Sequence, residues 1–187
     1  ATFSLDVSGR TPMTYQWRLN GVNISDATSA KLVIEPVALT DDGASYDVVI
    51  TNVDGTTVDG GAGNDELTGT PGDDDLSGGL GDDTYAFGTA TTAEADTVTE
   101  AASAGTDTLS FSTLTTDVIL NLGTTVVQTV HANRTLKLNA ASVFENIAGG
   151  SGNDTLTGNS LANILVGNAG DDTLNGSGGR DILIGGL

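Results

Sequence analysis

A nine-residue unit rich in glycine and aspartate recurs in the second part of the chain, and it limits the possible folds more than any other feature. Seven units keep this phase, beginning at Gly60, Gly69, Gly78, Gly149, Gly158, Gly167 and Gly176. The sixth position holds an acid or its amide: Asp65, Asp74, Asp83, Asp154, Asn163, Asp172 and Asp181. The eighth position is large and apolar: Leu67, Leu76, Tyr85, Leu156, Leu165, Leu174 and Leu183. A short fixed period of this kind is typical of a solenoid, in which each repeat packs on its neighbours.

The unit divides into a six-residue turn and a three-residue strand. Glycine permits the positive φ angles of a tight turn, and a three-residue strand directs its central side chain opposite to the outer two. Each turn reverses the chain, so alternate turns fall on the same edge and one coil takes two units. We therefore predict an all-β fold, a parallel β-roll whose coils stack roughly 4.8 Å apart.

This winding places Asp65 over Asp83 and Asp154 over Asp172. Like charges stacked in a sheet repel each other, and a divalent cation between them reverses the sign of the interaction. Carboxylate and carbonyl oxygens suit Ca²⁺ better than Mg²⁺, which prefers a tighter octahedron and retains its waters. Zinc is disfavoured because the chain has no cysteine and a single histidine, His131. The sequence therefore predicts several Ca²⁺ ions.

Charge and composition narrow the range of partners. The 25 acidic and 6 basic residues give a formal net charge of −19, which disfavours nucleic acid and anionic membranes. Without cysteine there can be no disulfide. No apolar stretch approaches the ~18 residues of a membrane span.

The first part of the chain, residues 1–59, is expected to form short strands, and about residues 1–58 resemble an incomplete bacterial immunoglobulin-like domain. Tyr15-Gln16-Trp17 resembles the strand that carries the core tryptophan of such domains. The segment from Asp42 to Val48 resembles their tyrosine corner, with Leu5 and Val48 at the two cysteine positions. We thus expect a partial immunoglobulin-like β-sandwich over 1–59, a first β-roll block over 60–86, a β spacer over 87–148 and a second block over 149–187.

About residues 60–187 resemble the repeats-in-toxin (RTX, hemolysin-type) calcium-binding family. The resemblance implies a parallel β-roll, folding triggered by extracellular Ca²⁺ and type I secretion. It also implies that an earlier turn supplies the carbonyls of positions two and four, a later turn those of positions one and three, and both turns their sixth side chain.

Carried onto this chain, the pattern implies three sites. The first comprises Gly61, Gly63, Asp65, Gly78, Leu80 and Asp83. The second comprises Gly150, Gly152, Asp154, Gly167, Ala169 and Asp172. The third comprises Asn159, Leu161, Asn163, Gly176, Gly178 and Asp181, and is weaker because Asn163 and Leu161 replace the aspartate and glycine of the pattern. Asp74 meets Thr92 eighteen residues later, so Asp96, Glu100 or Asp107 could serve as its metal-binding partner instead.

No catalytic motif is present: the chain contains no HExxH and no G-x-S-x-G, and His131 is expected on a strand surface. We therefore expect an extracellular, non-enzymatic calcium-binding segment with a structural or adhesive role in a large secreted or surface protein of a bacterium. Its partners would be calcium and other subunits or a cell-surface ligand. One alternative is a secretion and folding module attached to a hydrolase or toxin. The other is a subunit of a strand-donating fibre.

Overall fold

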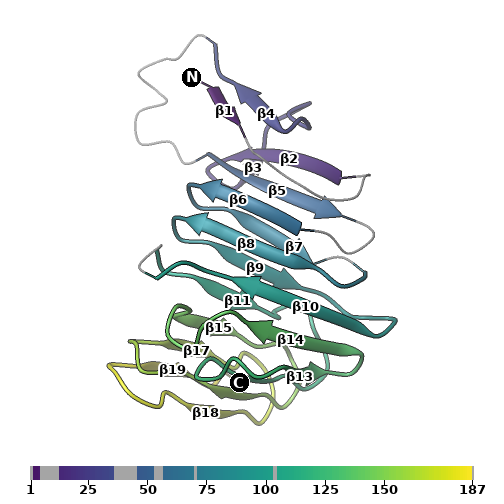
Figure 1. Cartoon of the computed structure of the whole chain (residues 1–187). Helices are drawn as coiled ribbons and strands as arrows, with labels where there is room; N and C mark the ends of the chain where they lie inside the picture. Colours follow the sequence, from purple (N-terminus) through teal and green to yellow (C-terminus); the bar gives the residue numbers. More distant parts are fainter. Residues whose placement is uncertain are drawn as a thin grey trace.

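The computed structural model describes residues 2–4, 13–35, 46–52, 57–69, 71–102 and 105–186. Strands and turns account for all the secondary structure of these residues, and the strands lie in layers from the N-terminal segment to the last coil (Figure 1). The all-β parallel β-roll predicted from the repeat is confirmed, and it continues through the spacer. None of the described residues forms a helix that is long and apolar enough to span a bilayer.

Successive strands alternate between the faces of the roll. One face is a nine-stranded sheet of β2 (Met13–Leu19), β3 (Val22–Asn23), β5 (Tyr46–Asn52), β7 (Glu66–Gly69), β9 (Thr84–Phe87), β11 (Thr108–Ser110), β15 (Asn146–Ala148), β17 (Ile164–Val166) and β19 (Ile182–Ile184). The other face holds a five-stranded sheet of β6 (Thr57–Ala62), β8 (Asp75–Leu80), β10 (Glu94–Thr99), β13 (Gln128–His131) and β14 (Arg134–Leu138). A three-stranded sheet of β12 (Ile119–Asn121), β16 (Thr155–Thr157) and β18 (Thr173–Asn175) continues that face.

Strand register gives the winding directly. Leu67 pairs with Tyr85, and Leu165 pairs with Leu183, so both blocks wind eighteen residues per coil in parallel register. The spacer keeps the same stacking with longer coils, because Leu109 pairs with Tyr85 on one side and with Ile147 on the other. The coil between Leu109 and Ile147 contains β12, β13 and β14. The spacer is therefore part of the roll.

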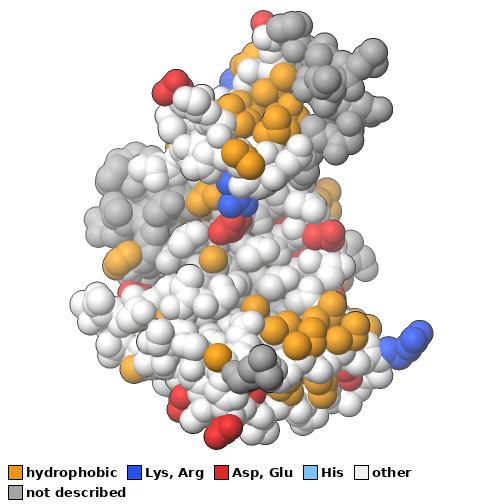
Figure 2. Space-filling model, turned by 180° about the vertical axis from the view of Figure 1, so that it is seen from behind, with side chains coloured by type: hydrophobic (Ala, Val, Ile, Leu, Met, Phe, Trp, Pro, Cys, Tyr) orange, Lys and Arg blue, Asp and Glu red, His pale blue; other side chains and the backbone are white. Residues whose placement is uncertain are grey.

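The eighth-position side chains fill the narrow core. They are fully or almost fully buried from Leu67 to Leu165. Aromatic rings widen the core at the spacer, where Phe87 and Phe111 stack with centroids 5.2 Å apart. Apolar side chains reach the surface at the end of the stack opposite the N-terminal strands, where β19 is the last strand (Figure 2). Leu183 there is 47% exposed because no described strand pairs with the outer edge of β19.

The N-terminal strands join the roll. β2 pairs antiparallel with β5 and places Trp17 opposite Val48, both buried, while β5 pairs in parallel with β7 of the first block. β1 (Thr2–Ser4) and β4 (Lys31–Val33) form a separate antiparallel pair. The strands expected around Trp17 and Val48 are present, but β2, β3 and β5 extend the sheet of the roll, and an immunoglobulin-like domain is not confirmed. The expected boundary between residues 59 and 60 lies inside β6.

Two parts of the immunoglobulin-like resemblance lie outside the described residues. They are Leu5 and the segment from Asp42 to Ser45. Tyr46 itself is half-buried, and its ring stacks on Phe3 with centroids 5.2 Å apart.

A glycine substitution tests the coil stacking. Gly79 has a φ of +99°, and a Cβ there would collide with the Gly61 carbonyl of the previous coil. We expect Gly79→Ala to lower the free energy of unfolding by about 1–3 kcal/mol, because the strained backbone and the blocked contact both favour the unfolded chain. Urea denaturation at a fixed Ca²⁺ concentration measures the loss. Gly88→Ala is the matched control, since a Cβ at Gly88 meets no atom within 4 Å, and equal stabilities for the two variants would contradict the stacking.

Candidate metal centres

The sixth-position side chains form hydrogen-bonded ladders along both edges of the roll. On the first edge, the Asp65 N–H donates to Asp83 Oδ1 (2.8 Å), and the Asp83 N–H donates to Asp107 Oδ1 (2.9 Å). The Asp107 N–H donates in turn to Glu145 Oε2 (2.9 Å). On the second edge, the Asp154 N–H donates to Asp172 Oδ1 (2.9 Å). The predicted stacking of Asp65 over Asp83 and of Asp154 over Asp172 is present.

Glu145 is a member of the ladder that the sequence reasoning missed. It lies eighteen residues before Asn163, and Ile147 occupies the eighth position of the same unit. Extending the nine-residue period backwards from Gly149 to Ala140 would have found it. The absence of glycine in residues 140–148 concealed the unit.

Oxygen atoms converge where the first glycine of a turn leaves room. A Cβ on Gly60 would lie 2.6 Å from Asp65 Oδ2 and 2.7 Å from the Gly78 carbonyl oxygen of the next coil. The Gly61 and Gly63 carbonyls point along the stack toward that coil, where they would collide with a Cβ on the residues above them. The Leu80 carbonyl points back and accepts the Gly63 N–H (2.6 Å). Oxygens of both turns of the first predicted site therefore lie between the two coils.

The second predicted site repeats this arrangement on the other edge. A Cβ on Gly149 would collide with Asp154 Oδ2 and lie 3.0 Å from the Gly167 carbonyl oxygen. The Gly152 carbonyl points toward the next coil, and the Gly150 carbonyl accepts the Ala169 N–H (3.4 Å). These donors are all oxygens, so they fit a hard divalent cation such as Ca²⁺.

At the third predicted site, amide side chains form hydrogen bonds with backbone groups of the turns. Asn163 Oδ1 accepts the Asn159 N–H (2.8 Å), and Asn163 Nδ2 donates to the Glu145 carbonyl (2.9 Å). Asn159 Nδ2 donates to a backbone carbonyl (2.8 Å), Asn159 Oδ1 accepts the Leu161 N–H (2.8 Å), and the Gly178 N–H donates to the Asn159 carbonyl (2.9 Å).

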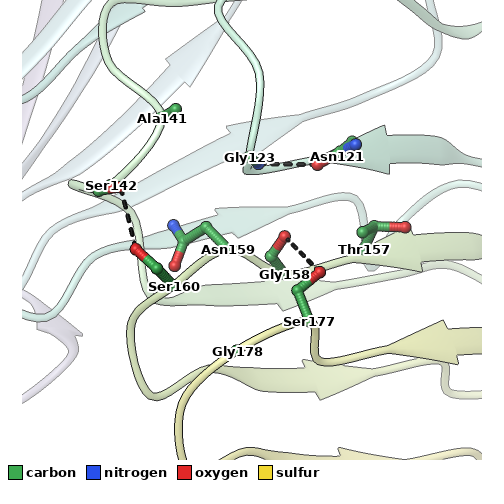
Figure 3. Close-up of a pocket in the computed structure, with 10 residues that line it drawn as sticks. All are labelled: Asn121, Gly123, Ala141, Ser142, Thr157, Gly158, Asn159, Ser160, Ser177 and Gly178. Carbon is green, nitrogen blue, oxygen red and sulfur yellow. Dashed lines mark hydrogen bonds between the residues drawn. The ribbon is translucent and has the colours of Figure 1, made fainter.

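A Cβ on Gly158 would lie 2.7 Å from the Gly176 carbonyl, so this gap is lined by oxygen too, but only Asp181 contributes a carboxylate. Asp181 Oδ1 accepts the Asn163 N–H (3.0 Å). The adjoining surface pocket is lined by hydroxyl, amide and backbone groups from turns such as 157–160 and 177–178 (Figure 3). The low charge makes this the weakest of the three predicted sites.

Burial makes several carboxylates at these turns costly to ionise, among them Asp83, Glu100, Asp107 and Asp154. Eight acids lie buried among the residues whose burial the structure describes, and acidic groups are scattered on the face in Figure 2. Burial raises the pKa of Asp83 to about 6, against the Asp65 N–H bond and with the help of the Asp107 charge. Burial also raises the pKa of Glu100 to about 7, against a hydrogen bond from Tyr85. The pKa values of Asp107 and Asp154 are raised as well, mainly by burial. A nearby cation would relieve this cost.

At one place on the second edge the protein supplies that cation itself. The Asp74 N–H donates to Asp96 Oδ1 (3.0 Å), as in the other ladders. The buried Arg134 guanidinium is ion-paired with Asp96 and with Glu94 (2.6 Å), and it lies 5.0 Å from the centre of the Phe87 ring. Asp96 thus stacks with Asp74 as one of the options expected, but its partner cation is Arg134, so a metal is not needed here.

The first glycine of this turn has different surroundings from those at the other sites. A Cβ on Gly69 would meet the Phe87 ring at 3.2 Å and Arg134 Nη1 at 3.5 Å, where the other first glycines face oxygens. Asp74 and Asp96 were expected to be metal ligands, but the space beside Gly69 is not lined by oxygen atoms. Sequence reasoning could not find Arg134, because it lies 38 residues from Asp96 and outside the repeat phase.

His131 is buried, whereas a strand-surface position was expected. It lies in β13 at an irregularity opposite Arg134 and is 7% exposed. Burial and the Arg134 charge lower the pKa of its imidazole, so the ring carries little charge at neutral pH. The surface position predicted from the sequence was wrong, because the pairing of β13 with β14 sets His131 opposite Arg134.

A comparison of the chain with models of known protein families identifies the same nine-residue repeat. The family model for the RTX calcium-binding nonapeptide repeat (4 copies) matches residues 51–85, 144–160 and 157–187. The matched residues include Glu145 and Ile147, which the glycine phase alone had not revealed. No curated protein shows a significant match to the chain.

Replacing Arg134 tests the internal cation. We expect Arg134→Gln to lower the free energy of unfolding by about 3–5 kcal/mol in saturating Ca²⁺, because it leaves two buried carboxylates without a counter-charge. Urea denaturation provides the measurement. Arg180→Gln removes the same charge from an exposed position and should change stability by less than about 0.5 kcal/mol. A similar small loss for both variants would refute the role of Arg134.

Low pH should partly stabilise the calcium-free fold, because protonation removes charge from the buried carboxylates. The pKa values of Asp83 and Glu100 are higher in the fold than in the unfolded chain, so the fold retains protons that the unfolded chain has released. Stability of the calcium-free fold is therefore greatest below about pH 4 and falls as the pH rises to about 7. Circular dichroism of calcium-stripped protein should therefore show more β signal at pH 5 than at pH 7. The double variant Asp83→Asn, Glu100→Gln should respond less, and a β signal that grew with pH would contradict the assignment.

Proposed function

Because the chain carries RTX calcium-binding nonapeptide repeats, we propose that it is a calcium-dependent structural or adhesive segment of a larger secreted or surface protein of a bacterium. RTX repeats bind Ca²⁺, several ions per repeat domain, and they act structurally, not catalytically. They typically occur in secreted bacterial proteins. The chain's calcium sites are the two oxygen-lined gaps at Gly60 and Gly149.

A buried carboxylate and a backbone carbonyl from the next coil converge at Gly60 and again at Gly149, and this convergence supports calcium binding most directly. Asp65 and Asp154 each place one carboxylate oxygen beside such a carbonyl. Glycine keeps that space open, and the strand pairing holds the two turns in register. Bound Ca²⁺ would supply the positive charge and accept six to eight such oxygens at 2.3–2.6 Å.

The chain's own residues make folding depend on that charge. Asp83 stacks next to Asp65, and Asp172 stacks next to Asp154. The like charges of each pair oppose stacking until they are compensated. A ligand that binds only the folded chain stabilises it by RT ln(1 + [Ca²⁺]/Kd) per site. Extracellular calcium modules often bind at ~10⁻⁴–10⁻³ M, so the fold would form outside the cell.

A structural role is favoured by the continuity of the nine-stranded sheet. The sheet runs from β3 and β2 through every coil to β19, so the coils and the N-terminal strands form one layer. A segment that calcium stiffens over its length suits a spacer or stalk. The alternative, a folding and secretion module for a hydrolase or toxin, would use the same calcium sites, and the sequence flanking this chain distinguishes the two.

Calcium removal tests the proposed function. We expect a chelator to abolish most of the β signal in circular dichroism and added Ca²⁺ to restore it, because the stacked carboxylates then lack or regain a counter-charge. An unchanged spectrum would refute the proposal.

A matched pair of variants assigns the second site. Asp172 Oδ2 is buried and has no hydrogen-bond partner among the described residues, which suits a metal ligand. Asp172→Asn should weaken one calcium-binding step in calorimetry by at least the ~10–100-fold that follows loss of an outer-shell group. Asp171→Asn removes the same charge from the exposed neighbouring position and should leave calcium binding unchanged. Equal binding by both variants would exclude Asp172 as a ligand.

A further inference from the structure

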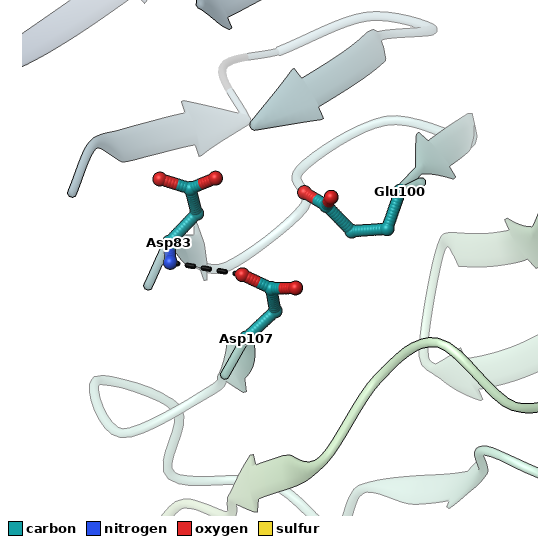
Figure 4. Close-up of side chains that lie close together, drawn as sticks. All are labelled: Asp83, Glu100 and Asp107. Atoms are coloured by element: carbon teal, nitrogen blue, oxygen red, sulfur yellow. Dashed lines mark hydrogen bonds between the residues drawn. The ribbon is translucent and has the colours of Figure 1, made fainter. Parts of the chain in front are cut away.

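Three carboxylates meet between the turns that follow β8 and β10. Asp83, Glu100 and Asp107 are each at most 3% exposed, and one oxygen from each lies within 4.8 Å of the others (Figure 4). Asp83 and Asp107 stand 24 residues apart, so this gap falls outside the eighteen-residue spacing of the repeat sites.

Glu100 takes the place that a backbone carbonyl holds elsewhere. At Gly60, the open space lies between the aspartate of its own turn and the first carbonyl of the next turn. At Gly78, a Cβ would collide with Asp83 Oδ2 and with Glu100 Oε1. Glu100 begins the turn after β10, so its side chain contributes a full negative charge where the repeat sites have a neutral carbonyl.

An independent observation points to this gap as a cation site. Asp83 Oδ2 and Asp107 Oδ2 are both buried and have no hydrogen-bond partner within the described part of the chain. Their other oxygens accept the Asp65 and Asp83 N–H groups. No ion pair among the described residues involves any of the three acids, in contrast to Asp96 beside Arg134.

Neighbouring groups hold Glu100 in position. The Tyr85 hydroxyl is hydrogen-bonded to Glu100 Oε1 and accepts the Gly78 N–H (2.6 Å). Asn139 fixes the Glu100 backbone, because Asn139 Nδ2 donates to its carbonyl (2.6 Å) and Asn139 Oδ1 accepts its N–H (3.1 Å). In the folded roll, these contacts therefore hold the carboxylate at the gap.

We propose that Asp83, Glu100 and Asp107 form a further Ca²⁺ site, and that this site is the tightest in the chain. It has three carboxylates where each repeat site has two, and calcium affinity rises with ligand charge and with the rigidity of the site. The site adds to the two sites of the proposed function and shares Asp83 with the first of them. It stands at the start of the irregular coils, so it would fill first and join the first block to the spacer.

Calorimetric titration of the full chain with CaCl₂ tests the site. Wild type should show one tight binding step followed by weaker ones. Glu100→Gln should lose the tight step, with at least a tenfold weaker first binding constant, and keep the weaker ones. Asp75→Asn, which removes one charge from an exposed position in β8, should match wild type.

If wild type binds calcium and Glu100→Gln binds it identically, this inference is overturned while the repeat sites stand. If wild type binds no calcium, the proposed function fails as well.

Terbium luminescence gives a second readout that does not depend on the folding of Glu100→Gln. Tb³⁺ substitutes for Ca²⁺ at oxygen sites and emits when a nearby tyrosine is excited. Tyr85 contacts Glu100, so the first equivalent of Tb³⁺ should emit in wild type. At saturating Tb³⁺, Tyr85→Phe, which keeps the ring in the core, should lose that emission. Unchanged emission from Tyr85→Phe would place the first ion elsewhere and overturn the proposal.

Discussion

In-register stacking of acidic side chains is the constraint on which the other features of this roll depend. Parallel pairing sets Asp65 beside Asp83 and Asp154 beside Asp172, and each backbone N–H binds one oxygen of the next carboxylate. That hydrogen bond fixes the side chain but leaves its second oxygen facing a gap between coils. The apolar core favours closing each coil, whereas the ladder charges oppose it. A cation at the gap removes the opposition.

The chain meets this requirement in three ways along the stack. Oxygen-lined gaps at Gly60 and Gly149 suit a divalent ion, and the gap at Gly78 carries an additional carboxylate from Glu100. Arg134 provides an internal cation beside Asp96, held by Glu94 and the Phe87 ring. Asn163 avoids the charge altogether, because its amide both accepts and donates hydrogen bonds. Calcium dependence is therefore expected to vary from coil to coil.

The irregular middle of the chain extends the roll. Its coils take 24 and 38 residues, yet their strands keep parallel register with the blocks on both sides. Stacked rings of Phe87 and Phe111 fill the wider core, and some of the surplus residues form the β13–β14 hairpin, which extends the sheet beside β10. This hairpin brings Arg134 and His131 inward, so the break in the repeat is also where the ladder obtains its internal cation.

The nine-residue period was sufficient to predict the eighteen-residue winding, the buried eighth positions and the two aspartate pairs. These features depend on glycine conformation and side-chain alternation, which act within a few residues. The partners of the ladder in the middle of the chain were decided by tertiary structure. Arg134 and Glu100 belong to no repeat unit, and only the strand register of the long coils brings them to Asp96 and Asp83. Loop lengths set that register, and a local pattern carries no information about where a long loop returns.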